Sequence, residues 1–222
     1  MATLTNYLPQ PHVDGKSRTW DHFSYTKLAV LGEGRQRVCW KAVDSDSKPI
    51  AVVKEVFKKF ETPEIQHYLQ VVETLKEHPN IVDVRSWFWT EQRKEPHFKF
   101  FQIQPCYEGT LVDAINQAFF ENHPHWIEPA FNQLAEGLAF IHSKKVIVND
   151  LKADNIFWLM EEKCLCLVYG DFGGADLPNK PSTQYTLTEN YCSPSRLEDK
   201  IKTQADDVFG LQVLEELLEL LD

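Results

Sequence analysis

The first 105 residues alternate short runs of apolar and β-branched residues with turn-forming segments. The runs of strand-forming composition cover residues 25–31, 38–43, 50–56, 82–89 and 98–104. Gly32-Glu33-Gly34 and the turn-rich segment 44–49 separate the first three runs, which is the pattern of an antiparallel meander. We therefore expect a five-stranded antiparallel sheet.

One helix is predicted inside this series. Thr62 is suited to be its N-cap and Pro63 to be its first residue, and His78-Pro79-Asn80 would end it. Between them, apolar residues recur at the spacing of a helix with one buried face: Ile65, Tyr68, Leu69, Val72 and Leu75.

After Gly109 the periodicity becomes helical. Helices are predicted over residues 110–121 and 129–143, and the second has one buried stripe at alternating steps of four and three: Ile127, Phe131, Leu134, Leu138 and Ile141. Strand fragments at 156–158 and 164–168, a loop over 174–203 and a helix over 204–222 follow. The expected class is α+β, with two lobes.

The lobes are predicted to have the following boundaries. Residues 25–104 form a β-rich lobe with one helix, residues 105–109 connect the lobes, and residues 110–222 form a mainly helical lobe. Residues 1–24 lack periodicity and are expected to be a tail, which could pack on the body through Tyr7, Leu8 and Trp20.

Composition restricts the class of protein. Of 222 residues, 43% are hydrophobic and 12% aromatic, which excludes a disordered chain. The net charge of -10 and the lack of a long basic run argue against nucleic acid and anionic membranes as partners. Five scattered cysteines indicate a reducing compartment rather than a disulfide framework, and no segment resembles a signal peptide or a membrane span. We expect a soluble intracellular protein, cytoplasmic or nuclear.

Two features of the β-rich lobe suit an anionic ligand. Gly32 and Gly34 lie between predicted strands, where glycines let backbone N–H groups approach phosphates closely, although a plain hairpin explains them equally well. Lys54 is a lone cation at the end of an apolar run. Pointing inward, it would need an anion as partner, whereas an exposed edge-strand lysine would not.

The most specific pattern spans residues 148–155 and the motif Gly170-Asp171-Phe172-Gly173. Asp150 could receive a hydroxyl proton, and Lys152 could meet a phosphoryl group in transfer. Asn155, five residues after Asp150, and Asp171 would supply an amide and a carboxylate to hold magnesium. A chance coincidence of polar turn residues in this order, downstream of the glycine loop and the lysine, is a far weaker explanation.

In motif order and spacing, residues 25–222 resemble a eukaryotic-type protein kinase domain. The resemblance implies ATP and Mg²⁺ as cofactors, with Asp150 and Lys152 in catalysis and Asn155 and Asp171 as metal ligands. Asp207 matches the helix-F aspartate that braces the catalytic loop. Segments 78–82, 87–89, 102–106 and 109–115 are similar to the Wee kinases and the translation-initiation-factor kinases.

The same resemblance assigns a nucleotide pocket. It makes Ile103 the gatekeeper and lets the Gln104 carbonyl and the Cys106 N–H meet the adenine edge. The remaining residues that it places on the nucleotide are these: Leu31, Gly32, Gly34, Val38, Val52 and Lys54. An ordinary strand exit into a turn would explain segment 103–106 equally well if the other motifs were absent.

Several positions depart from the family pattern. Tyr68 stands where the helix-C glutamate should pair with Lys54, and Glu64, one turn away on the same face, is the nearest acid before it. Arg37 replaces the third loop glycine. Val148-Asn149 replaces His-Arg before the catalytic aspartate, so control through a phosphorylated activation loop is not expected. Ser193-Pro194-Ser195 stands in place of Ala-Pro-Glu.

The leading hypothesis is an ATP- and Mg²⁺-dependent kinase acting on Ser or Thr of proteins, because Lys152 follows the catalytic aspartate as in kinases of that class. The alternative is a pseudokinase that binds nucleotide and acts as a scaffold. The chain ends inside helix F, which is apolar on nearly every side, and we expect a second copy, a partner or the tail to cover it.

Overall fold

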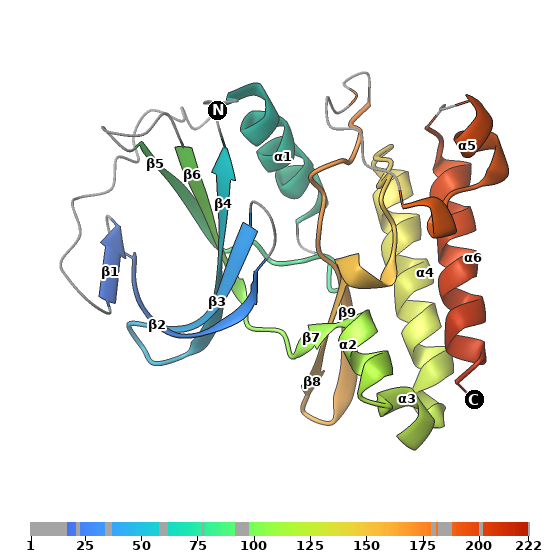
Figure 1. The fold of residues 1–222 in the computed structure, drawn as a ribbon, viewed down its shortest axis with the longest axis horizontal. Helices are drawn as coiled ribbons and strands as arrows, with labels where there is room; N and C mark the ends of the chain where they lie inside the picture. Colours follow the sequence, from blue (N-terminus) through green and yellow to red (C-terminus); the bar gives the residue numbers. More distant parts are fainter. Residues whose placement is uncertain are drawn as a thin grey trace. The chain divides into compact units, whose positions relative to one another are not determined.

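The computed structural model describes residues 17–20, 23–33, 37–57, 62–76, 78–91, 98–178, 181, 188–199 and 202–221. Figure 1 shows the order of their helices and strands along the chain. The chain divides into two compact units. One comprises residues 1–62 and 83–106, and the other comprises residues 63–82 and 107–222.

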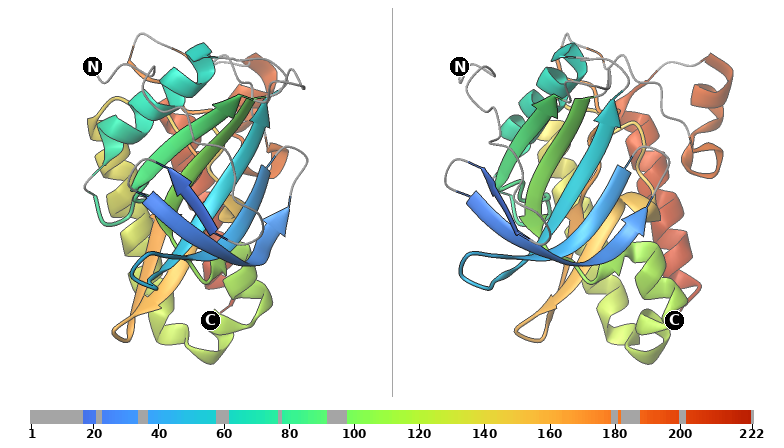
Figure 2. Two further views of the ribbon diagram at one scale, coloured as in Figure 1. Left: turned by 90° about the vertical axis from the view of Figure 1, so that its left-hand side faces the viewer. Right: turned by 60° about the vertical axis from the view of Figure 1, so that its left-hand side comes forward.

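The first unit is built on an antiparallel sheet in the order β1-β2-β3-β4-β6-β5, seen from two sides in Figure 2. Its strands are β1 (Ser17–Trp20), β2 (Phe23–Glu33), β3 (Arg37–Asp44), β4 (Pro49–Phe57), β5 (Ser86–Glu91) and β6 (Phe98–Pro105). All five strands expected from the sequence are present, and the antiparallel arrangement is confirmed.

The sheet also has a strand that the sequence analysis assigned to the tail. Residues 17–20 form β1, and its register pairs Trp20 with Phe23 and Ser17 with Thr26. A hairpin at this point covers backbone groups of β2 that would otherwise form an open sheet edge. The tail prediction was therefore wrong for residues 17–20.

The buried face of this sheet has a compact apolar cluster with Trp40 packed against it. Its members are Tyr25, Ala42, Ile50, Phe101 and Ile103. The Lys27 ammonium lies 3.4 Å from the centroid of the Trp40 ring, a cation–π contact that further restrains the ring.

The second unit combines helices with a small sheet of order β7-β8-β9. Its strands are β7 (Gly109–Thr110), β8 (Ile156–Glu161) and β9 (Cys164–Tyr169). Its α-helices are α1 (Thr62–Leu75), of which residues 63–75 belong to this unit, α2 (Leu111–Asn116), α3 (Phe119–Asn122), α4 (Ile127–Ser143), α5 (Pro194–Asp199) and α6 (Gln204–Glu219). Helices α4 and α6 pack side by side (Figure 1).

Helix α4 packs against β9 and fully buries three of the five residues of the predicted stripe, whereas Ile127 and Phe131 are only half-buried. Leu134, Leu138 and Ile141 are at most 2% exposed. The Tyr169 hydroxyl of β9 donates to the Leu134 carbonyl over 2.7 Å. Gly137 allows this approach, because a Cβ at that position would lie 2.8 Å from Tyr169 Cε2. The strand that leads into Asp171 is thereby fixed on α4.

Two predicted segments differ in detail. The helix expected over residues 110–121 is divided into α2 and α3, because Ala118 adopts the left-handed conformation with φ of 55°. Within the predicted loop 174–203, residues 194–199 form α5. Pro194 at its first position is well suited to start a helix.

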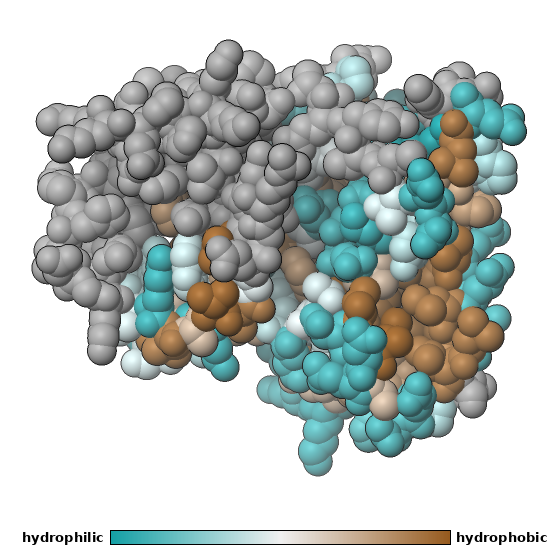
Figure 3. Space-filling model, viewed as in Figure 1, coloured by the Kyte–Doolittle hydropathy of each residue, from teal (hydrophilic) through white to brown (hydrophobic). Residues whose placement is uncertain are grey.

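Helix α6 begins with a capping box in which Thr203 and Asp206 exchange hydrogen bonds. Leu211, Leu214 and Leu218 are buried, whereas Val208 is 44% and Leu220 is 83% exposed. Figure 3 shows apolar side chains gathered over the α6 side of this unit. No helix in the described part of the chain is both long and apolar enough to cross a bilayer.

Candidate active site

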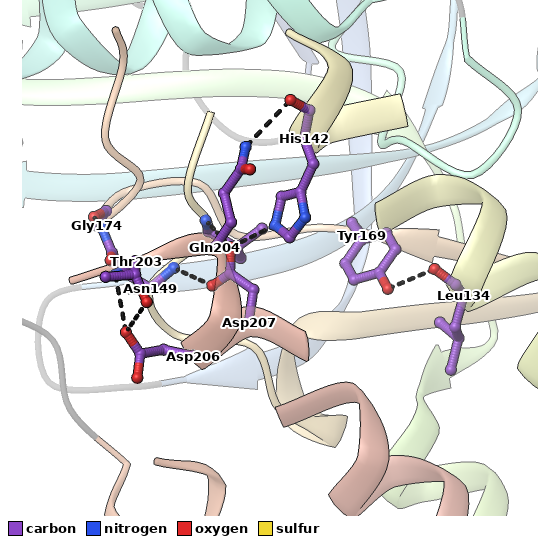
Figure 4. A network of polar contacts seen from close by, with 10 residues as sticks. Leu134, His142, Asn149, Tyr169, Gly174, Thr203, Gln204, Asp206 and Asp207 are labelled. Carbon is purple, nitrogen blue, oxygen red and sulfur yellow. Dashed lines mark hydrogen bonds and ion pairs between the residues drawn. The ribbon is translucent and has the colours of Figure 1, made fainter. Parts of the chain in front are cut away.

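Asp207, in the first turn of α6, holds the backbone of the segment that leads into Asp150. Its Oδ2 accepts from the Val148 N–H over 2.8 Å, and its Oδ1 accepts from the Asn149 N–H over 2.9 Å. The His142 ring of α4 lies 3.0 Å from Oδ2 (Figure 4). Asp207 is 1% exposed, so this carboxylate satisfies buried amides and fixes the loop on two helices.

Asp150 is the centre of a compact polar triangle. Its Oδ1 accepts from the Thr188 hydroxyl over 2.8 Å, and its Oδ2 lies 2.9 Å from the Lys152 ammonium. Lys152 also donates to Thr188 Oγ1 over 3.0 Å. The Asp150 side chain is 15% and the Lys152 side chain 21% exposed. A carboxylate held in this way is oriented and still reachable by a substrate hydroxyl.

Asn155 connects this triangle to Asp171. Its side-chain Nδ2 donates to the Asp150 carbonyl over 2.8 Å and to Asp150 Oδ2 over 3.2 Å. Its own carbonyl accepts from the Gly170 N–H over 2.8 Å, and Gly170 is next to Asp171. Segment 148–155 and the Asp171 motif are therefore joined by a backbone hydrogen bond.

The chemistry of Asn155 and Asp171 fits a magnesium ion. Because Asn155 uses its Nδ2 as donor, its Oδ1 is the side-chain atom that can serve as a ligand, and Asp171 supplies a carboxylate. Mg²⁺ typically takes one or two protein carboxylates and completes its shell with water and phosphate oxygens.

The strand before Asp171 ends in a buried phenol. Burial, and secondarily the negative charge of Asp207, raises the pKa of Tyr169 far above its ordinary value of 10. Near neutral pH Tyr169 is therefore a neutral hydrogen-bond donor to the Leu134 carbonyl.

Asp206, beside Asp207, holds a second loop. The Ser193 hydroxyl donates to its Oδ1, and the Thr203 N–H and hydroxyl each donate to its Oδ2 over 2.8 Å. Burial alone would raise the pKa of Asp206, but these hydrogen bonds and the charge of Arg196 outweigh it and hold the pKa below its usual 3.8. Neighbouring acids on α6 thus anchor the loop containing Asp150 and the loop that follows Thr188.

In the first unit, the structure places some of the predicted nucleotide residues on neighbouring strands. Leu31 and Gly32 lie on β2, and Leu31 is 48% exposed. Val38 on β3 pairs with Lys54 on β4, and Val52 lies two residues before Lys54 on that strand. Gly34 and the side chains of Val52 and Lys54 lie outside the described residues. The assignment of these residues to nucleotide stays a prediction.

The residues predicted to meet adenine lie at the end of β6 and directly after it. Ile103 is fully buried and pairs with Val52, and Gln104 is 6% exposed. Burial raises the pKa of the Cys106 thiol despite the lowering effect of Lys41. The predicted contacts of Gln104 and Cys106 with adenine remain untested.

The departures from the family pattern are only partly described. Tyr68 is half-buried on α1, at the position predicted for the helix-C glutamate. The side chains of Arg37, Glu64 and Lys54 lie outside the described residues, so the suggested pairing of Glu64 with Lys54 stays a prediction. Asn149 is 2% exposed and donates to the Gly174 carbonyl over 2.8 Å.

Sequence reasoning missed Thr188. It lies 38 residues after Asp150 within a predicted loop, and no local periodicity marks it. The available signal was weak: a hydroxyl residue shortly before Ser193-Pro194-Ser195, the segment that stands in place of Ala-Pro-Glu.

Comparisons with known proteins agree with the motif pattern. Aurora kinase A-A of Xenopus laevis is 27% identical over 216 residues, covering 92% of this chain and 49% of the relative. The interferon-induced, double-stranded RNA-activated protein kinase of Rattus norvegicus is 34% identical over 225 residues, covering 90% and 42%. A PAS domain-containing serine/threonine-protein kinase of Mus musculus is 28% identical over 190 residues, covering 79% and 13%. The chain thus spans half the length or less of these relatives.

The family profile described as "Protein kinase domain" matches residues 25–221, which include every motif discussed above, whereas strand β1 lies before the match. This chain belongs to the protein kinase family.

Proposed function

We propose that this chain transfers the γ-phosphoryl group of ATP, in a Mg²⁺-dependent reaction, to a serine or threonine hydroxyl of a protein. Family membership supports kinase chemistry, and relatives with Ser/Thr kinase names support the acceptor class. The observation that carries the proposal is the contact of Asp150 with both Thr188 and Lys152.

In this reaction Asp150 orients the acceptor hydroxyl and receives its proton. The acceptor oxygen forms a bond to the γ-phosphorus, the bond from that phosphorus to the bridging oxygen breaks, and ADP leaves. Lys152 provides positive charge beside the phosphoryl oxygens as negative charge redistributes. Asn155 and Asp171 would hold Mg²⁺, whose chemistry is to neutralise phosphate charge.

The second candidate function is a pseudokinase that binds nucleotide without efficient transfer. Tyr68 favours this candidate, because a half-buried phenol at the predicted helix-C position cannot form the ion pair that anchors the phosphate-binding lysine. Phosphoryl transfer by the purified protein separates the two candidates.

The test measures transfer from radiolabelled ATP to the protein itself and to general acceptor proteins. Asp150→Asn should abolish transfer and leave ATP affinity within a few-fold. Asp154→Asn, the same substitution at an exposed position of the same loop, is the matched control and should keep wild-type transfer. Thermal stabilisation of the wild type by ATP and Mg²⁺ without any transfer would favour the pseudokinase.

A further inference from the structure

We propose that Asn149 and His67 are positioning residues that hold residues 174–175, directly after Asp171-Phe172-Gly173, without any modification of that segment. We call their two side-chain hydrogen bonds to the Gly174 and Ala175 carbonyls the carbonyl clamp. Its catalytic consequence rests on the proposed function, whereas the clamp itself does not.

The first half of the clamp comes from the catalytic loop. Asn149 Nδ2 donates to the Gly174 carbonyl over 2.8 Å (Figure 4). The backbone of Asn149 has φ of 70°, in the left-handed region that asparagine and glycine tolerate best. Its N–H donates to Asp207, so the side chain starts from a fixed point.

The second half comes from helix α1. His67 Nε2 lies 2.7 Å from the Ala175 carbonyl, and His67 is 6% exposed. A carbonyl only accepts, so Nε2 carries the hydrogen in this contact. The bond joins residues 108 positions apart in the sequence and ties α1 to the segment.

The next residue is held as well. Asp176 exchanges backbone hydrogen bonds with Ile147, at 2.8 Å from the Asp176 N–H and 3.0 Å from the Ile147 N–H. Its carboxylate lies 3.4 Å from the Lys202 ammonium. Three consecutive residues are thus restrained by α1, by the segment around the catalytic loop and by the start of α6.

Backbone hydrogen bonds connect the restrained residues to Asp171, the predicted metal ligand. The Ala175 N–H donates to the Phe172 carbonyl over 3.2 Å, and the Gly173 N–H donates to Asp171 Oδ1 over 3.0 Å. A fixed position of residues 174–175 therefore fixes the turn that orients the Asp171 carboxylate.

A simpler explanation is that Asn149 is only a buried polar residue with satisfied hydrogen bonds. Asn149 Oδ1, however, has no hydrogen-bond partner among the described residues, although Asn149 is only 2% exposed. A buried acceptor without a partner costs stability. Glycine would allow the same backbone conformation without that cost, so the amide donor to Gly174 is the feature that favours asparagine here.

The test is hydrogen exchange of the nucleotide-free full chain. The Ala175 and Asp176 amides report on the clamp, and the Val82 and Tyr169 amides, which are bonded elsewhere in the same unit, are references. Asn149→Gly keeps the backbone conformation accessible and removes the donor. His67→Leu removes the other donor.

Each variant should speed exchange of the reporter amides roughly tenfold, as expected for loss of one buried hydrogen bond, and leave the references unchanged. His67→Gln, which can present a donor where Nε2 lies, should restore slow exchange. Gln66→Ala, at the exposed neighbouring position of α1, should have no effect. Phosphatase treatment of the wild type should leave all four rates unchanged.

Unchanged reporter amides in both variants would overturn the proposal, as would equal acceleration of reporters and references, which indicates global destabilisation. A change after phosphatase treatment would show that modification holds the segment. In the same variants, stabilisation by ATP with Mg²⁺ should fall more than stabilisation by ATP with chelator. A wild type with protected reporter amides but no transfer would refute the proposed function and leave the clamp intact.

Discussion

The Thr188 hydroxyl donates to Asp150 Oδ1 over 2.8 Å and accepts from Lys152 over 3.0 Å, so it joins the two predicted catalytic side chains. This hydroxyl bonds to one carboxylate oxygen of Asp150, and the Lys152 ammonium contacts the other oxygen directly, at 2.9 Å. Asp150 is consequently restrained through both oxygens before a substrate arrives, which lowers the cost of orienting it in the transition state.

We expect Thr188→Val, which preserves side-chain shape, to lower the transfer rate about 10- to 100-fold. This range corresponds to a hydrogen bond to a charged group, worth about 1.5–3 kcal/mol. Thr188→Ser should keep most of the rate because it keeps the donor. Steady-state kinetics check both variants. A full rate for Thr188→Val would show that Lys152 and Asn155 alone orient Asp150.

Asp171→Asn should remove magnesium-dependent stabilisation by nucleotide more completely than Lys54→Met. Asp171 is predicted to hold the metal directly, whereas Tyr68 leaves Lys54 without its usual helix-C glutamate. Thermal shift with ATP, with and without Mg²⁺, measures the difference. Equal losses would indicate that Lys54 has an acidic partner, and Glu64→Gln would then identify it.

The Asp206 carboxylate should make stability depend on pH on the acid side. Its pKa in the folded state is lowered below 3.8, so its contribution is present above that value and is lost as pH falls through the folded pKa. Asp206→Asn should cost about 1–3 kcal/mol near pH 7 and flatten the loss of stability in acid. Urea denaturation from pH 3 to 7 tests this, with Asp154→Asn as the exposed control. If the unfolding free energy of Asp206→Asn fell with decreasing pH as steeply as that of the wild type, the lowered pKa of Asp206 would be contradicted.

Gly137→Ala in α4 has two opposing effects on stability, a gain in helix propensity and a loss from overpacking. Alanine gains about 1 kcal/mol over glycine in a helix, but its Cβ would lie 2.8 Å from Tyr169 Cε2 and 3.0 Å from Asn80 Cβ. Overpacking costs about 1–3 kcal/mol, so we expect a net loss of stability. Gly210→Ala in α6 is the matched control, because its nearest neighbour is 3.3 Å away. Thermal denaturation should find Gly210→Ala the more stable of the two.

Helices and strands were predicted best from the sequence where apolar residues recur periodically over a long segment. Helix α4 ends at Ser143 as expected, and the Leu134, Leu138 and Ile141 part of its apolar stripe is buried. The break at Ala118 could not be predicted, since alanine favours helix and no neighbouring residue marks it for the left-handed conformation that it adopts. The strand at 17–20 was missed because its composition is polar and its pairing with β2 is what stabilises it.

The candidate site shows the same limit. Asp150, Lys152, Asn155 and Asp171 were found because they lie in short motifs of fixed spacing. Thr188 and His67 act across 38 and 108 residues, respectively, and each looks like an ordinary loop or helix residue in the sequence. Long-range polar contacts of this kind depend on where the fold brings two segments together, which local patterns do not encode.

The exposed apolar residues of the second unit lead to a prediction about association. Leu220 is 83%, Val208 44% and Leu197 of α5 44% exposed. Burial of each such side chain would contribute about 1.5–3 kcal/mol, a large fraction of the 5–15 kcal/mol that stabilises a typical domain. We therefore expect the protein not to persist as a bare monomer at micromolar concentration.

Light scattering and apolar dye binding check this prediction, with Val208→Lys/Leu220→Lys as the variant and Leu214→Ala as the control. The lysine variant should lower the apparent mass or raise the salt dependence of association. Its unfolding free energy should change by about 0.5 kcal/mol or less per site, because both residues are exposed in the chain itself. Leu214 is fully buried, so Leu214→Ala should lose about 2–5 kcal/mol without altering the exposed surface.

Deletion of residues 1–16 tests which molecule covers the exposed apolar residues. If residues 1–16 cover them, the deletion should increase dye binding; if another molecule covers them, dye binding should not change. A monomeric wild type that binds no dye before or after the deletion would refute the prediction.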